Sequence, residues 1–219
     1  MRARAKLFLA SSNPGKLEEF RALANASAPG VTDALNARVE IELLPGFDVL
    51  PSFPEDAPTF AENAAGKALH YSRLGGGYVF ADDSGLVVPS LGGAPGVHSA
   101  RYAGPNATDA ERIAKLLGEL RGKEGAERAA YFVCAIALAE QGRALAIVTA
   151  RVGGEILESP RGGGGFGYDP VFYFPALRKA FAELLPQEKN RISHRGKAFR
   201  RMLASLRNSE GQGMPCPGD

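Results

Sequence analysis

The sequence contains few of the features that mark several large classes of protein. It has 2 cysteines and 3 histidines in 219 residues. Cys134 lies in an alternating apolar segment and Cys216 in a segment rich in proline and glycine, and this spacing fits neither a disulfide framework nor a metal knuckle. His70 and His98 belong to no ligand pattern, so we interpret them as structural. We therefore expect a protein of a reducing compartment, the cytoplasm.

An excess of charge of one sign and long apolar runs are also missing. Lysine and arginine total 26 against 24 acidic residues, a formal net charge of +2. This balance offers no polybasic stripe, so we expect no direct nucleic-acid binding, and any anionic ligand must be held by local groups. The apolar run Leu7 to Ala10 is too short for a signal peptide, and no run reaches membrane-spanning length, which predicts no membrane association.

The hydrophobic content of 45% is sufficient for a large core, and its periodicity predicts an α/β fold. Strand and helix patterns alternate through the first half, and two alternating apolar segments joined through residues 140–143 predict a long antiparallel hairpin. We expect a mixed β-sheet covered by helices with a projecting antiparallel hairpin lobe, and an active-site groove between the lobes. The further expected elements and boundaries are helical pieces at 179–186 and 193–206, a loop insertion at 24–38, one bilobed domain over 1–207 and a disordered tail over 208–219.

The segment SNPGK follows the first predicted strand. Asn13 is a good helix N-cap and Pro14 suits the first helical position, so the free backbone amides, with Lys16 beside them, predict an anion site. The segment lacks the full phosphate-binding loop pattern, and any capped helix can begin in this way.

The pair Asp82-Asp83 stands where the apolar run YVFA meets Ser84-Gly85. Neighbours on an extended segment point to opposite faces, so we expect one carboxylate to face a pocket and the other the supporting structure. The plain alternative is a turn, which these residue types favour. Glu55, just before a helix, is either a second Mg²⁺ ligand or a charge that complements the helix dipole.

Three further sets of residues suggest a binding site. Asn63 and Lys67 lie four apart and share a helix face. In GGGGFGYDP, Phe166 and Tyr168 either stack on a flat base or pack into the core. SHRGKAF places His194 and Arg195 in the first turn of a helix, where cations are disfavoured, so this cluster suggests an anionic or carbonyl-bearing partner or else an ordinary set of surface salt bridges.

Taken in order, LASSNPGK, TFAENAAGKA, FADDSGLVVPSLGGAPGVHSARYAG, GGFGYDPVF and ISHRGKAF resemble the motifs of the inosine/xanthosine triphosphate pyrophosphatase family. The resemblance covers about residues 6–207. It implies Mg²⁺-dependent hydrolysis of ITP, dITP and XTP between the α and β phosphorus atoms, usually by a homodimer. It also implies that Asp83 is the catalytic acid group and that Asp83 and Glu55 bind the metal. The substrate-binding residues that it implies are Ser11, Ser12, Asn13, Pro14, Gly15, Lys16, Asn63, Lys67, Ser84, Phe166, Gly167, Tyr168, Asp169, Lys189, His194 and Arg195.

Two other hypotheses remain open at this point. A Maf-like nucleotide pyrophosphatase would cleave the same bond in other modified nucleotides, but its early motif carries SPRR where this chain has SNPGK. A regulatory domain would bind a triphosphate without hydrolysing it. Binding alone needs only the cationic groups, so the presence of Asp83 beside a candidate metal ligand favours an enzyme.

Overall fold

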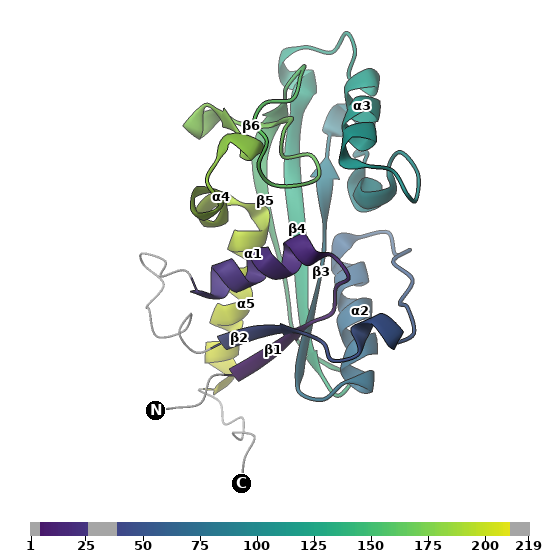
Figure 1. Cartoon of the computed structure of the whole chain (residues 1–219), viewed down its shortest axis with the longest axis vertical. Coiled ribbons are helices and arrows are strands. Elements are labelled where there is room, and N and C mark those ends of the chain that lie inside the picture. The colour runs from purple at the N-terminus through teal and green to yellow at the C-terminus, as the bar shows by residue number, and fades with distance from the viewer. Residues whose placement is uncertain (1–4, 26–38, 211–219) are drawn as a thin grey trace.

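One mixed sheet runs through the computed structural model, which describes residues 5–25 and 39–210 (Figure 1). Its strands, in chain order, are β1 (Ala5–Leu9), β2 (Val39–Leu43), β3 (Tyr78–Val87), β4 (Ala129–Glu140), β5 (Arg143–Ile156), β6 (Phe172–Phe174) and β7 (Lys179–Ala180). The spatial order is β2-β1-β3-β4-β5-β6-β7. β1 is parallel to β2 and β3, and all later neighbours are antiparallel.

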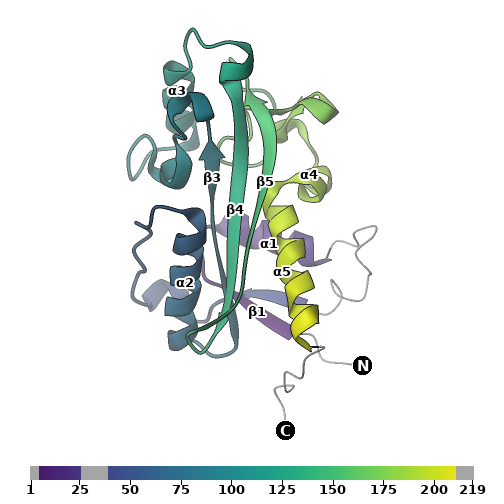
Figure 2. The same ribbon diagram turned by 180° about the vertical axis from the view of Figure 1, so that it is seen from behind.

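Helices cover both faces of this sheet, as Figures 1 and 2 show from opposite sides. The α-helices are α1 (Pro14–Asn25), α2 (Phe60–Leu74), α3 (Asp109–Glu119), α4 (Pro186–Ile192) and α5 (His194–Glu210). α2 packs on one face and α1 with α5 on the other, which confirms the predicted mixed sheet covered by helices. None of the helices in the described part of the chain is long and apolar enough to cross a membrane.

The pleat of the central strands separates two cores. On the α2 face the strands carry mostly alanine, and they meet Ala64 and Ala68 of the helix, so helix and sheet approach closely. On the other face Phe80 packs against Phe20 of α1 and Phe199 of α5. A third core joins α3 to the far ends of β3, β4 and β5 and to β6.

The predicted hairpin is present, but its place in the fold differs from the expectation. β4 and β5 turn at Gln141 and Gly142, whose φ angles of 49° and 77° fit a tight hairpin turn. The turn does not project, because the amide of Gly142 donates a hydrogen bond to Ser72 Oγ on α2 (3.0 Å). The hairpin is the centre of the sheet. Its open end extends into the part of the molecule that contains α3 and β6, which we call the second lobe; the first lobe contains β1, β2, α1 and α2 (Figure 1).

The structure decides one alternative and corrects one local prediction. Asp82 and Asp83 lie on an extended strand, as expected, and the turn alternative is excluded: β3 continues to Val87, because the long apolar strand β4 pairs with it from Val79 onward. Residues 179–186 are not a helix but β7 and a 3-10 turn, since Phe181 is drawn into the aromatic core beside Phe132 and Phe172.

The boundaries of the chain's other segments agree only in part. α4 begins at Pro186 and was not predicted. α5 reaches Glu210, three residues into the expected tail, and the remainder of that tail lies outside the described residues. Residues 24–38 were expected to hold the end of the first helix and a loop insertion: residues 24 and 25 end α1 as expected, and 26–38 lie outside the described residues.

Candidate active site

A cleft of about 1370 Å³ opens beside the carboxyl end of β1, with walls from both lobes. Residues from separate motifs come together there. The predicted residues that border it are Ser11, Ser12, Asn13, Pro14, Gly15, Lys16, Glu55, Lys67, Asp83, Ser84, Phe166, Gly167, Tyr168, Asp169, Lys189, His194 and Arg195. Asn63 is fully buried and lies behind the wall, where it bonds Asp83.

The start of α1 forms one end of the cleft. The predicted N-cap is confirmed, since Asn13 Oδ1 accepts a hydrogen bond from the amide of Lys16 (3.3 Å). A Cβ on Gly15 would lie 3.4 Å from the Phe166 ring and 3.3 Å from Asn13 Oδ1, so glycine lets the loop approach Phe166 closely. Pro14 has no N–H and the amide of Lys16 donates to Asn13, so Gly15 carries the remaining amide of the first turn. With the helix dipole, this amide makes the end suited to an anion.

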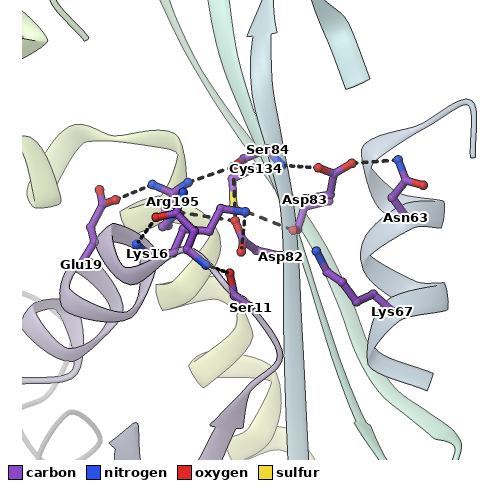
Figure 3. A network of polar contacts seen from close by, with 12 residues as sticks. Ser11, Lys16, Glu19, Asn63, Lys67, Asp82, Asp83, Ser84, Cys134 and Arg195 are labelled. Atoms are coloured by element: carbon purple, nitrogen blue, oxygen red, sulfur yellow. Dashed lines mark hydrogen bonds and ion pairs between the residues drawn. The ribbon is translucent and has the colours of Figure 1, made fainter. Parts of the chain in front are cut away.

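Asp82 points to the face of β3 covered by α1 and α5 (Figure 3). Its Oδ1 lies 3.0 Å from Lys16 Nζ, and its Oδ2 lies 3.6 Å from Arg195 Nε and accepts a hydrogen bond from Ser84 Oγ (3.2 Å). The side chain is fully buried. Burial opposes ionisation, but Lys16 and Arg195 outweigh it and hold the pKa of Asp82 below its usual range.

Asp83 points to the opposite face, toward α2 (Figure 3). Its Oδ2 accepts a hydrogen bond from Asn63 Nδ2 (2.9 Å) and its Oδ1 one from the amide of Ser84 (2.9 Å). Burial raises the pKa of Asp83; the bond from Asn63 acts in the other direction, and the Glu55 carboxylate adds to the rise. The expectation of opposite faces is confirmed, and Asp83 is the carboxylate of the pair that borders the cleft.

Glu55 and Lys67 form an ion pair at the cleft, with 2.8 Å between Oε1 and Nζ. Burial lowers the pKa of Lys67, but Glu55 and the other nearby carboxylates outweigh this, so the pKa is raised. Arg101 fixes the main chain of this segment by donating to the carbonyl oxygen of Glu55 (2.9 Å).

The described residues contain no cluster of three or more acidic, histidine or cysteine side chains that could hold a metal. Asp83 and Glu55 nevertheless border the same cleft. Mg²⁺ is usually held by one or two carboxylates together with waters and substrate phosphates. The donor set therefore fits a Mg²⁺ ion that arrives with a phosphorylated substrate.

The glycine-rich loop surrounds the carboxylate of Asp169. Asp169 Oδ2 lies 2.6 Å from Lys189 Nζ and accepts a hydrogen bond from the amide of Phe166 (3.0 Å). Gly165 has a φ of +73°, and a Cβ there would lie 2.1 Å from the same oxygen, so this position requires glycine. The last glycine of the run is thus explained by a tight loop around one buried acid.

The two aromatic residues of that loop differ in their surroundings. Phe166 is half-buried and presents its ring to Lys189, whose Nζ lies 5.0 Å from the ring centroid. Tyr168 is buried in the core of the second lobe, and its hydroxyl donates to the carbonyl of Ser99 (3.0 Å). The core-packing alternative therefore holds for Tyr168, and Phe166 is the ring available to a base.

His194 and Arg195 begin α5 as predicted, and Ser193 Oγ accepts a hydrogen bond from the amide of Gly196 (3.0 Å). Burial, with help from nearby Arg195, holds the pKa of His194 well below its usual value, so the ring is neutral at pH 7. The interpretation of His194 as a cation at a helix N-terminus is therefore wrong. Arg195 is 2% exposed, pairs with Glu19 and donates to Ser84 Oγ (2.9 Å), which excludes an ordinary surface salt bridge.

Three residues of the site were not predicted. Glu19 forms an ion pair with Arg195, and its Oε1 lies 3.8 Å from Lys189 Nζ. Because residues three apart on a helix share a face, its spacing from Lys16 could have indicated that Glu19 lies on the same side of the helix as the site. Asp109 begins α3 and accepts a hydrogen bond from the amide of Gly167 (2.7 Å). Phe132 of β4 stacks on His194 with 4.7 Å between ring centroids. The last two contacts depend on how the second lobe packs, which no local pattern specifies.

Comparison with known proteins gives extensive matches. The chain matches the Ham1 family model over residues 7–205. It is 50% identical over 197 residues to a dITP/XTP pyrophosphatase of Geobacillus kaustophilus, covering 90% of this chain and 92% of the relative. A dITP/XTP pyrophosphatase of Gloeobacter violaceus is 50% identical over 198 residues, covering 90% of this chain and 92% of that relative.

A solved structure has the same fold. It is a HAM1 protein from Coxiella burnetii, which matches with a TM-score of 0.78 and 42% sequence identity, covering 93% of this chain and 99% of that chain. The family resemblance drawn from the five motifs is thus confirmed by sequence and by fold. The chain belongs to the Ham1 family.

Proposed function

We propose that this protein hydrolyses nucleoside triphosphates that carry deaminated purines, namely ITP, dITP and XTP, to the monophosphate and pyrophosphate. The observation that carries the proposal is the meeting of Asp83, the start of α1 and the half-buried Phe166 in one cleft. The names of the relatives, dITP/XTP pyrophosphatases, support the same substrates. The activity would remove these nucleotides before they enter DNA and RNA.

Charge in the cleft supports a divalent cation as part of the substrate complex. The cations that border the cleft already face carboxylates: Lys16 faces Asp82, Lys67 faces Glu55, Arg112 faces Asp109, Lys189 faces Asp169 and Arg195 faces Glu19. These side chains alone would neutralise little of a triphosphate. Mg²⁺ held by Asp83 and Glu55 would supply the remaining charge neutralisation on the phosphates.

The residues of the chain divide the reaction between them. The amides of Ser12 and Gly15, together with Lys16 and Lys67, would hold the phosphates in position for in-line attack. Asp83 would orient a water and accept its proton as the water oxygen bonds to the α-phosphorus. The bond from that phosphorus to the bridging oxygen breaks, and pyrophosphate leaves with the electron pair.

Base choice follows from hydrogen-bond donors at the other end of the cleft. Hypoxanthine and xanthine present an oxygen acceptor at position 6, where adenine presents an amino donor. Lys189 has three N–H donors, of which Asp169 takes one, so a donor remains for that oxygen. Adenine would leave a buried polar group without a partner, which disfavours ATP.

Product analysis tests the proposal. The purified protein with Mg²⁺ should convert ITP, dITP and XTP to monophosphate and pyrophosphate, with ATP and GTP far slower. Release of diphosphate and orthophosphate, or equal rates with ITP and ATP, would contradict it. A regulatory domain would instead bind ITP without forming any product.

Three further properties belong to the same proposal. We infer a homodimer and a cytoplasmic location, and we expect no binding to DNA or RNA. Light scattering after gel filtration measures the mass of the assembly, and cell fractionation locates the protein. A monomer at micromolar concentration would contradict the first inference.

A further inference from the structure

Asp82 is a buried carboxylate to which the proposed reaction assigns no role. It is fully buried and does not border the cleft. It nevertheless contacts Lys16, Ser84 and Arg195, all of which do (Figure 3). Asp82 is therefore placed behind the cleft, where it acts on residues of the wall and not on a ligand.

The two cations that share Asp82 come from distant parts of the chain. Lys16 belongs to α1 and Arg195 to α5, and the two helices meet on one face of the sheet. Lys16 Nζ lies 3.0 Å from Oδ1 of Asp82, and Arg195 Nε lies 3.6 Å from Oδ2. The carboxylate of Asp82, in the middle of β3, therefore links Lys16, which the proposed function places at the phosphates, to Arg195, which it places beside the base.

We propose that Asp82 is a positioning residue, which holds the Lys16 ammonium and the Arg195 guanidinium in a fixed relation before a nucleotide enters. The inference rests on the proposed function, which places Lys16 at the phosphates and Arg195 beside the base. Asp82 touches neither the substrate nor the metal. Its effect on turnover passes through the two cations.

The physical reason lies in the freedom of a lysine side chain. Lysine has a flexible four-carbon stem, and aligning it on a phosphate costs rotamer entropy. An ion pair with a rigid, buried partner restricts the stem before binding. Glu19, whose side chain is 9% exposed, gives Arg195 a second carboxylate but lies on the same helix as Lys16. Asp82 is the carboxylate of this ion-pair group that belongs to the sheet, so it holds the Lys16 side chain against β3.

The first test is the isosteric variant Asp82→Asn in a double-mutant cycle with Lys16→Met. Alone, Asp82→Asn should lower kcat/KM for ITP on the order of 10²-fold, since a small misplacement of a positioning group has effects of this size. In the Lys16→Met background it should lower kcat/KM by no more than about 10-fold, because the cation through which it mainly acts is already gone. The control Glu18→Gln, an exposed carboxylate on the same helix as Lys16 that neither borders the cleft nor belongs to these ion pairs, should leave kcat/KM unchanged. Equal fold losses in both backgrounds would overturn the proposal.

The second test does not depend on hydrolysis. Calorimetric titration with inorganic pyrophosphate should give a dissociation constant at least about 10-fold weaker in Asp82→Asn than in the wild type. If the wild type binds pyrophosphate but does not hydrolyse ITP, the proposed function fails while this result still supports the positioning role. Undiminished affinity in a folded Asp82→Asn variant contradicts the positioning role, whatever the enzyme hydrolyses.

Asp82→Asn removes a negative charge that compensates the buried cations Lys16 and Arg195, which can destabilise the fold. Folding of the variant is therefore checked by circular dichroism. Should it fail to fold, the ammonium group of Lys16 can be observed by nitrogen-15 NMR in the wild type, assigned with Lys16→Met. A slowly exchanging ammonium signal in the ligand-free protein is the expected result. A freely exchanging, mobile Lys16 ammonium would overturn the proposal.

Discussion

On one face of β3, Asp82 lies between Lys16 and Arg195 with no exposed surface; on the other, Asp83 accepts a hydrogen bond from Asn63 and reaches the cleft. The residues are adjacent and chemically identical. What differs is the helix that covers each face, because α1 and α5 bring cations while α2 brings an amide and the Lys67–Glu55 pair. The strand pleat thus turns one carboxylate into an ion-pair group and the other toward the cleft, where the proposed reaction uses it.

The largest effect expected on this comparison comes from Asp83→Asn. The variant keeps the shape of the side chain but removes the carboxylate, so kcat for ITP should fall on the order of 10²-fold or more while ITP binding survives. Pyrophosphate release measures the first quantity and equilibrium dialysis the second. Full turnover in this variant would remove Asp83 from the mechanism and the contrast with Asp82 would lose its functional meaning.

The Asp83 face also carries Lys67, whose replacement should have the next largest effect. Lys67→Met removes a cation that the proposed function places at the phosphates and takes away the partner of Glu55, so kcat/KM for ITP should fall on the order of 10- to 10²-fold. Lys6→Met is the matched control, because Lys6 pairs with Glu42 at a similar distance, 2.9 Å, on the surface. Such exposed pairs contribute little, so steady-state kinetics should be unchanged in the control. Equal losses in both variants would argue for a general charge effect.

Farther along the same face, Gly85 tests how rigidly β3 is held. A Cβ there would lie 2.3 Å from Ser99 Oγ and 2.7 Å from the carbonyl oxygen of Gly96, in the 3-10 turn Gly96–Arg101. Gly85→Ala should lower the free energy of unfolding by about 1–3 kcal/mol. Gly76→Ala, where no heavy atom lies within 4 Å, should change it by less than about 0.5 kcal/mol. Urea denaturation measures both, and equal stabilities would show that the turn can move away from β3.

The smallest effect concerns pH and belongs to the face that carries Asp82, where α5 begins. The pKa of His194 is well below its usual value in the folded protein, so at pH below about 6.5 the unfolded chain binds a proton that the folded chain does not. Stability therefore falls as pH falls through this range, by up to about 1.4 kcal/mol per pH unit from this residue. In His194→Asn the slope of the unfolding free energy against pH, between pH 5 and 6.5, should be smaller by the amount that corresponds to about one bound proton. Identical slopes would mean that His194 is protonated in the folded protein.

Much of this arrangement could be predicted from local patterns. The cap at Asn13, the hairpin at residues 140–143 and the opposite orientations of Asp82 and Asp83 all follow from turn chemistry and strand periodicity. The predicted site residues, apart from Asn63, border the cleft. These features depend on neighbours in the sequence, which is where periodicity carries information.

The remainder depends on contacts between distant segments. The sequence around Asp82 favours a turn, but β4, some fifty residues later, supplies pairing partners that keep the strand continuous. Similarly, KAFAELLP has a helical pattern, and the aromatic core around Phe132 overrides it. The partners of Asp82 and the neutral state of His194 required knowing which helices meet, and α5 lies at the other end of the chain.

The strands β3, β4 and β5 run through both lobes, and this has a consequence for how the protein can be divided. Neither lobe contains all the strands of the sheet. We therefore expect that a fragment made by cutting the described part of the chain between the lobes does not fold independently, because its strands lose their hydrogen-bonding partners. For fusion or split-protein engineering we expect the two lobes to behave as one unit, with a single cooperative melting transition in calorimetry.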